Sequence, residues 1–189
     1  MGRHRVIDRE AVLDAAERVV SRDGAVRLTL DAVATEAGIS KASVLYDYKT
    51  KQALTKAVIE RRVAVEEARV QEQIANLGPV DNAQILGCLA AASRPVSDDE
   101  RAVAISLCAA LAHDAELRQP IQKIHRERID EIRRTSTDPR GAMLAFLAVE
   151  GLMLLEWFGL HSWPAAEREQ LTADIAWLVA QSPSGPSAG

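Results

Sequence analysis

Apolar residues recur along most of this chain with the three- and four-residue spacing of amphipathic α-helices. No run of β-branched residues alternates with polar residues in the way that a half-buried strand requires. Glycine, proline and capping residues divide the helical pattern into nine segments. We therefore expect an all-α fold of about nine helices, with a small three-helix domain at the N-terminus and a larger helical bundle after it.

The first three expected helices are short and closely spaced. Asp8 can cap a first helix that ends at Gly24. Thr29 then caps a second helix that continues to Gly38, and Ser40 caps a third helix two residues later. The stripe that the first helix would bury consists of Val12, Ala16, Val19 and Val20. Two helices joined by a tight turn that contains glycine are typical of a helix-turn-helix.

Six further helices are expected, over residues 51–74, 82–92, 97–113, 114–134, 141–160 and 165–180. The segment 141–160 is almost wholly apolar and is the part of the chain most like a membrane span. Glu150 and Glu156 interrupt it, and because acids are costly in lipid we expect burial against its own domain and a second subunit instead. The final helix carries an apolar stripe formed by Leu171, Ile175, Leu178 and Val179. We therefore expect a homodimer through the last two helices.

The bulk composition is that of an ordinary globular protein, with 48% hydrophobic and 26% charged residues. The basic start at Arg3, His4 and Arg5 runs into a polar helical pattern without the apolar segment of a secretory signal, so we expect a cytoplasmic location. Cys88 and Cys108 lie in apolar stretches without CxxC spacing, which favours buried free thiols over metal binding or redox chemistry.

The net charge of −4 hides an asymmetry between the two ends of the chain. Residues 1–62 contain 12 Lys/Arg and 9 Asp/Glu, a net charge of +3, whereas residues 63–189 have a net charge of −7. Attraction to phosphates depends on the charges of the contacting face rather than on the whole chain. The first third is therefore the part that we expect to meet a polyanion.

The second and third expected helices have the chemistry of a DNA-reading motif. A reading helix presents small or hydrogen-bonding side chains at its N-terminal end, which Lys41, Ala42 and Ser43 occupy in the third helix. The capping residues Thr29 and Ser40 place backbone N–H groups and hydroxyls where phosphate oxygens can dock. These features predict that the motif reads the major groove of DNA.

Further donors lie within or just beyond this helix-turn-helix, which spans residues 29–48. The full set of residues that we expect on DNA is Arg5, Thr29, Ser40, Lys41, Ala42, Ser43, Tyr46, Tyr48 and Lys51. For Lys41, Ser43 and Lys51 the alternative is a plain solvated surface, which we consider less favoured.

The same stretch resembles the N-terminal domain of the TetR family of transcriptional regulators. The resemblance rests on Thr29, Val33, Ala34, Ala37, Gly38, Ile39, Ser40, Lys41, Lys51 and Leu54, after a first helix of the form Val12-Leu13-Asp14-Ala15-Ala16 that ends at Gly24. It covers about residues 9–54 without a gap. It implies a homodimer, a variable C-terminal effector domain, and release of DNA when a small molecule binds.

Position by position, the resemblance implies phosphate contacts for Thr29 and Lys51. It implies base or backbone contacts for Lys41 and Ser43, and close approach to the DNA at Ala42. We accordingly expect residues 1–50 to form a DNA-binding domain and residues 51–181 to form a ligand-binding and dimerisation domain. Residues 182–189 are rich in Pro, Gly and Ser and are expected to be a disordered tail.

The chain departs from the family pattern at the end of the third helix. Leu45 stands where the family usually has a phosphate-binding tyrosine, and Tyr46, about 100° further round the helix, is the candidate to replace it. Asp47 stands where His or Tyr is common and would repel phosphate unless Lys49 or another cation neutralises it. Tyr48 stands at a phenylalanine position, so the core is the alternative place for its ring.

A ligand pocket in a regulator of this kind would lie among the later helices and would be largely apolar with few polar anchors. The candidate lining residues are Leu89, Cys108, Ile124, His125, Met143, Phe146, Glu150 and Trp157. Glu150 is either the polar anchor of a ligand or a partner in a buried interhelical hydrogen bond, because a carboxylate in so apolar a helix needs a partner.

No catalytic signature is visible in the sequence: there is no GxSxG and no Gly-rich phosphate loop. The four histidines show no metal-binding spacing, although His113 and His125 could converge in space. We therefore expect no enzyme, no cofactor and no metal. The preferred hypothesis is a repressor that binds a palindromic operator and is released by a small-molecule effector. The alternative, suggested by Leu45 and Asp47, is a helical ligand-binding or scaffolding protein that has lost DNA binding.

Overall fold

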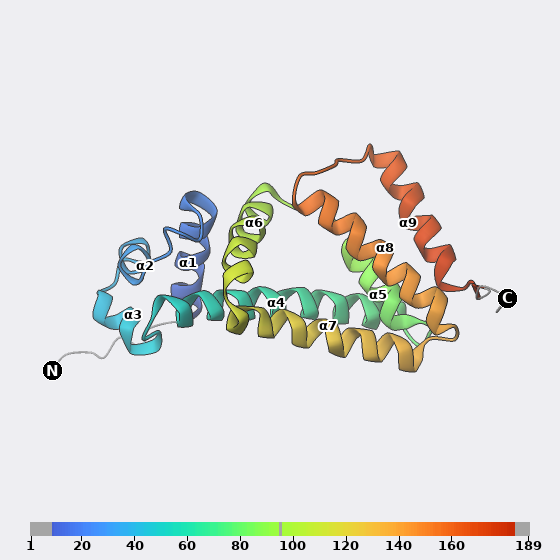
Figure 1. Ribbon diagram of the computed structural model, residues 1–189, viewed down its shortest axis with the longest axis horizontal. Coiled ribbons are helices and arrows are strands. Elements are labelled where there is room, and N and C mark those ends of the chain that lie inside the picture. Colours follow the sequence, from blue (N-terminus) through green and yellow to red (C-terminus); the bar gives the residue numbers. More distant parts are fainter. Residues whose placement is uncertain (1–8, 95, 184–189) are drawn as a thin grey trace. The chain divides into compact units, whose positions relative to one another are not determined.

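The computed structural model describes residues 9–94 and 96–183, and every regular element in this part of the chain is an α-helix (Figure 1). The helices are α1 (Arg9–Asp23), α2 (Leu30–Ala37), α3 (Lys41–Asp47), α4 (Lys51–Leu77), α5 (Ala83–Ala92), α6 (Asp98–His113), α7 (Ala115–Thr135), α8 (Pro139–Trp157) and α9 (Ala165–Val179). The all-α expectation is confirmed for the described residues. Asp8, the expected cap of the first helix, lies outside them. None of the described helices has the length and apolar character needed to cross a membrane.

The chain divides into two compact units, each built from two stretches of sequence. Among the described residues, the first unit comprises 9–63 and 97–121, and the second comprises 64–94, 96 and 122–183. The divisions fall inside α4 and α7, so each unit contains a part of both helices. The helix-turn-helix belongs to the first unit.

The core of the first unit is organised around α1, which contacts α2 and α6, while α2 contacts α3. The stripe expected on α1 is buried, because its four members are at most 1% exposed. Fully buried side chains from the other segments complete this core: Leu28, Val33, Val44, Leu54 and Val58. Helices as short as α2 and α3 are marginal in isolation, so packing against α1 stabilises them.

The core of the second unit is centred on α8, which contacts α5 and α9; Figure 1 shows α8 and α9 side by side. Its buried residues include Ile85, Leu89, Ile132, Ala142, Phe146, Val149 and Ile175. Only one side of α8 enters this core. On the other side, Leu144, Leu147 and Leu154 are 45%, 60% and 52% exposed. Within one chain α8 is therefore half-buried.

Helix α8 begins two residues earlier and ends three residues earlier than the apolar pattern predicts. At its start the carboxylate of Asp138 accepts hydrogen bonds from the N–H groups of Arg140 and Gly141, at 2.9 and 3.1 Å. Pro139, which has no N–H to satisfy, occupies the first turn. At its end Gly159 adopts a φ of +62°, a left-handed conformation that stops the helix.

Candidate nucleic-acid interface

A left-handed glycine makes the turn between α2 and α3. Gly38 has φ and ψ of 65° and 32°, and its N–H donates to the carbonyl of Thr35 at 3.2 Å. The N–H of Ile39 donates to the carbonyl of Ala34 at 3.0 Å, so the end of α2 is satisfied within the turn. A side chain at position 38 would be strained, because L-residues rarely adopt a positive φ. The turn thereby sets the direction in which α3 leaves α2.

Both helices of the motif begin with a hydroxyl cap, as the sequence predicts. Thr29 Oγ1 accepts a hydrogen bond from the N–H of Ala32 at 3.1 Å. Ser40 Oγ accepts from the N–H of Ser43 at 3.1 Å and lies 2.8 Å from Ser43 Oγ. Thr29 and Ser40 are exposed, so the helix N-termini that they cap are open to an anionic partner.

The first turn of α3 presents its side chains to solvent while one residue anchors the helix. Lys41 and Ala42 are exposed, Ser43 is half-buried, and Val44 is fully buried in the core. The ammonium group of Lys41 forms an ion pair with Asp31 on α2, with 2.8 Å between Nζ and Oδ2. Sequence reasoning did not identify Asp31, although its place in the first turn of α2 is ordinary for an acid.

The end of α3, where the chain departs from the family pattern, is stabilised by two cations. Tyr46 is 77% exposed, and the Lys49 ammonium lies 5.6 Å from the centroid of its ring. Asp47 pairs with Arg9 of α1, with 3.7 Å between the nearest N and O atoms. The Arg9 guanidinium also lies 5.7 Å from the ring centroid of Tyr48, which is only 4% exposed. Asp47 thus pairs with Arg9, whereas Lys49 lies over the ring of Tyr46, and the ring of Tyr48 packs into the core.

The remaining expected DNA contacts lie at the edges of the motif. Lys51 is exposed, and its Nζ donates to the backbone carbonyl of Val26 at 2.8 Å. This hydrogen bond joins the start of α4 to the loop between α1 and α2. Arg5 lies outside the described residues.

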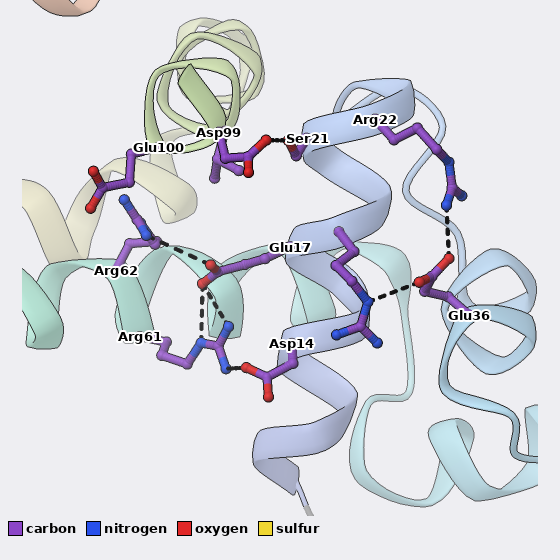
Figure 2. Close-up of a pocket in the computed structure, with 11 residues that line it drawn as sticks. Asp14, Glu17, Ser21, Arg22, Glu36, Arg61, Arg62, Asp99 and Glu100 are labelled. Carbon is purple, nitrogen blue, oxygen red and sulfur yellow. Dashed lines mark hydrogen bonds and ion pairs between the residues drawn. The ribbon is translucent and has the colours of Figure 1, made fainter. Parts of the chain in front are cut away.

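A charged cavity of about 510 Å³ in the first unit shows how α1 is held (Figure 2). Four arginines and five acids line it, so opposite charges nearly balance. Figure 2 shows Glu17 of α1 directed toward both Arg61 and Arg62 of α4. On the α6 side of the cavity, Ser21 Oγ donates to Asp99 at 3.0 Å. The balance of charge favours a joint between helices over a site for an anion.

Arg61 is the most engaged side chain of this joint. Its guanidinium contacts Asp14 at 2.6 Å and Glu17 at 2.8 Å, and its side chain is 15% exposed. Burial lowers the pKa of Arg61, but the hydrogen bonds to the two carboxylates outweigh that effect and raise it. Arg61 is therefore a fixed cation that holds one face of α1 against α4.

Another pair of arginines holds α2 against α1. Arg18 and Arg22 donate to the two carboxylate oxygens of Glu36 at 2.8 and 2.9 Å. These hydrogen bonds hold the pKa of Glu36 below its usual value, so the carboxylate stays ionised at neutral pH.

The residues expected to line a ligand pocket are divided between the units. Cys108 lies on α6 in the first unit, whereas the other seven belong to the second unit. Among those seven, His125 and Glu150 form an ion pair when the histidine is protonated, with 3.5 Å between Nε2 and Oε2. The His125 ring also packs edge-on against Phe146, with 6.5 Å between ring centroids. The structure thus brings together one acid, one titratable ring and one aromatic side chain.

The other expected pocket residues have less distinctive surroundings. Leu89 is buried in the core of the second unit, and Ile124 and Met143 are half-buried. Trp157 is half-buried, and its indole Nε1 is a buried atom that has no hydrogen-bond partner. No group of three His, Cys, Asp or Glu side chains in the described residues could hold a metal ion.

Sequence reasoning missed a buried ion pair in the second unit. Arg128 is 9% exposed and donates to Glu67 at 2.9 Å. Desolvation in the same core raises the pKa of the Cys88 thiol to about 11, so this cysteine is uncharged at neutral pH. The signal for Arg128 was available, because it follows His125 by three residues and precedes the buried Ile132 by four. An arginine on such an inward stripe indicates a buried partner.

We predict that Arg61→Ala lowers the free energy of unfolding by about 1–2 kcal/mol, because it removes charge-assisted hydrogen bonds from a mostly buried group. Arg61→Lys keeps the charge but not the two-pronged geometry, so an intermediate loss is expected. Urea denaturation followed by circular dichroism measures both changes. Arg62→Ala is the matched control, because Arg62 reaches Glu17 only at 3.6 Å and should cost less than Arg61→Ala. Equal losses at positions 61 and 62 would contradict the assignment.

Two family models match the chain. The model described as bacterial regulatory proteins of the tetR family matches residues 12–58. The model described as a tetracyclin repressor-like C-terminal domain matches residues 83–180, just over half of the chain. No curated protein sequence matches significantly.

Solved structures share the fold at low sequence identity. A protein described as a transcriptional regulator from Streptomyces coelicolor A3(2) has a TM-score of 0.72 and 18% identity, covering 92% of this chain and 98% of that chain. The multidrug binding protein EbrR, complexed with ethidium, has a TM-score of 0.66 and 20% identity, covering 93% and 99%. A regulator from Saccharomonospora viridis, in complex with choline, has a TM-score of 0.66 and 16% identity, covering 90% and 94%.

The agreement of both family models with the helix-turn-helix and the helical domain settles the family. The chain belongs to the TetR family of DNA-binding transcriptional regulators, a non-enzymatic family.

Proposed function

We propose that the chain is a transcriptional repressor that binds a palindromic operator as a homodimer and releases it when a small-molecule effector binds. In this proposal residues 1–50 contact DNA, residues 51–181 hold the effector and the second subunit, and the protein acts in the cytoplasm, where its DNA lies. The observation that supports DNA contact best is the start of α3, where the small and exposed Ala42 stands between Lys41 and Ser43.

The chemistry of α3 fits reading from the major groove. A methyl group at position 42 lets the helix approach base edges closely, and the Lys41 ammonium can donate to the acceptors of guanine. Ser43 can donate to a base or a phosphate. The exposed phenol of Tyr46 stands one residue after the usual tyrosine position and supplies a phosphate donor there.

We predict that Ala42→Glu abolishes sequence-specific DNA binding without unfolding the protein, because it adds bulk and negative charge at an exposed position of the reading helix. A gel shift with the DNA upstream of the protein's own gene measures the effect. The matched control is Ala115→Glu, which adds the same charge in the exposed first turn of α7, where the helix dipole tolerates an acid. The proposal fails if the unaltered protein forms no specific complex at low salt, or if the Ala42 variant binds as well as the control.

The exposed side of α8 supports a dimer. Leu144, Leu147 and Leu154 follow one another at three- and seven-residue spacing on this helix, and each is at least 45% exposed. Trp177 of α9, in the same unit, is 65% exposed. Aligned exposed apolar residues of this size are typical of an interface. A twofold dimer would present two reading helices, and this matches a palindromic operator.

We predict that the double variant Leu147→Glu, Leu154→Glu is monomeric by light scattering, because it buries two unpaired charges in the proposed interface. Its operator affinity should also fall at least about tenfold, because the two half-sites are no longer bound by one particle. Val65→Glu alters another exposed apolar residue, 47% exposed on α4, and serves as the control that stays dimeric. A dimeric double variant would exclude this face.

The second unit offers a polar anchor for an effector. Two structures of similar fold hold ethidium and choline, both of which are organic cations. In this chain His125 contacts both the Glu150 carboxylate and the Phe146 ring, so a carboxylate and an aromatic ring lie near each other. A carboxylate next to an aromatic side chain is suited to an organic cation. We therefore propose a hydrophobic cation as the effector and Glu150 as its anchor.

We predict that hydrophobic cations such as ethidium raise the midpoint of thermal unfolding, because a ligand that binds only the folded state stabilises it. Glu150→Gln should abolish this shift while preserving the shape of the side chain. Glu169→Gln, at an exposed position of α9, removes the same charge and should leave the shift intact. Equal shifts in wild type and Glu150→Gln would show that Glu150 is only an interhelical partner.

A further inference from the structure

The lysine at the start of the reading helix is already paired with an acid of its own motif. Lys41 Nζ lies 2.8 Å from Asp31 Oδ2, and the pair joins α3 to α2. Both side chains remain open to solvent, at 53% and 66% exposed. Because neither is buried, the pair contributes little to folding stability. Its position on the proposed DNA surface is therefore more informative than its contribution to stability.

An ammonium group has three N–H donors, and one carboxylate oxygen takes only one of them. Lys41 can thus stay on Asp31 while its other donors face an acceptor on DNA. The carboxylate restricts where the ammonium can lie, so a flexible four-carbon side chain becomes a directed donor. The pair is also electrically neutral, so its net electrostatic attraction to nearby backbone phosphates is small.

Other cations of the first unit are engaged in the same way. Arg9 pairs with Asp47, Arg22 pairs with both Asp23 and Glu36, and Lys51 donates to a backbone carbonyl. Much of the positive charge in the first third of the chain therefore faces acids or carbonyls of the protein. Of these residues, Lys41 is the one at the first position of the reading helix.

We propose that Asp31 is a specificity-determining residue. It positions Lys41 so that the ammonium group contacts base edges rather than backbone phosphates. The inference rests on the proposed function, because it requires that α3 reads DNA. On a matched sequence the ammonium bonds a base acceptor without leaving Asp31. On an unmatched sequence the carboxylate cancels the attraction of the Lys41 ammonium to the phosphate backbone. Asp31 therefore lowers affinity mainly where no base acceptor is in place.

The test compares wild type with Asp31→Asn on two duplexes of equal length. One duplex carries the sequence that wild type enriches from a random pool, and the other carries the same bases in scrambled order. Asp31→Asn should bind the scrambled duplex about threefold to tenfold more tightly at low salt, because it frees one lysine for phosphate contact. The slope of log affinity against log salt should steepen by about 0.9 for that duplex. Affinity for the selected duplex should change by less than about twofold, so the ratio between the two falls.

Two further variants separate this role from a general effect of charge. In a Lys41→Ala background, Asp31→Asn should leave the salt slope unchanged, because no lysine remains to be freed. Glu60→Gln removes one acid from an exposed position of α4 in the same unit and should also leave the slope unchanged. A purely structural role for Asp31 would alter unfolding but not the salt slope.

Three results overturn the inference. The first is an unchanged slope for Asp31→Asn. The second is equal tightening on both duplexes, which would make Asp31 a simple competitor for Lys41. The third is the same steepening in the Lys41→Ala background. If wild type enriches no sequence from the random pool, it is the proposed function that fails.

Discussion

The fold of the first unit depends on α1, because both its apolar face and its polar face have partners in the rest of the unit. On the apolar face Val12, Ala16, Val19 and Val20 are at most 1% exposed, and α2 and α6 pack against the helix. Its polar face carries acids that meet Arg61 and arginines that meet Glu36. Because α2 and α3 are too short to persist alone, the direction of the reading helix follows from how α1 is held.

The ion pairs around α1 both stabilise the first unit and fix the position of the helix. Arg61 contacts two carboxylates on one helix, and a fork of this kind fixes geometry as well as adding energy. Charges are paired in the same way on the proposed DNA-binding surface, where Asp31 pairs with Lys41 and Arg9 pairs with Asp47. A protein with a net charge of −4 can bind DNA only through local contacts, and these pairs keep those contacts directed rather than diffuse.

The second unit depends on a different constraint, which is the burial of the apolar surface of α8. Helix α8 is apolar on nearly all sides, but α5 and α9 cover only one of them. The second unit therefore combines exposed leucines on α8 with a buried ion pair between Arg128 and Glu67. The leucines favour association with another apolar surface, whereas the ion pair is tolerated inside the unit only because its partners meet at 2.9 Å.

The features that the sequence alone determined are local ones. The caps at Thr29 and Ser40, the left-handed Gly38 and the buried stripe of α1 depend on residues a few positions apart, whose spacing is visible in one dimension. The same spacing located the nine helices of the described residues, although the ends of α8 followed the cap at Asp138 and the turn at Gly159 rather than the apolar pattern. The family resemblance rested on these local positions too.

What the tertiary structure decided is which side chains meet across the chain. Lys41 and Asp31 are 10 residues apart, Lys51 and Val26 are 25 apart, and Arg61 and Asp14 are 47 apart. An exposed charge has many possible partners of opposite sign, and nothing in its own neighbourhood selects among them. Only the packing of α1 against α2, α4 and α6 brings particular pairs within hydrogen-bond distance, because helix positions, not sequence spacing, set those distances.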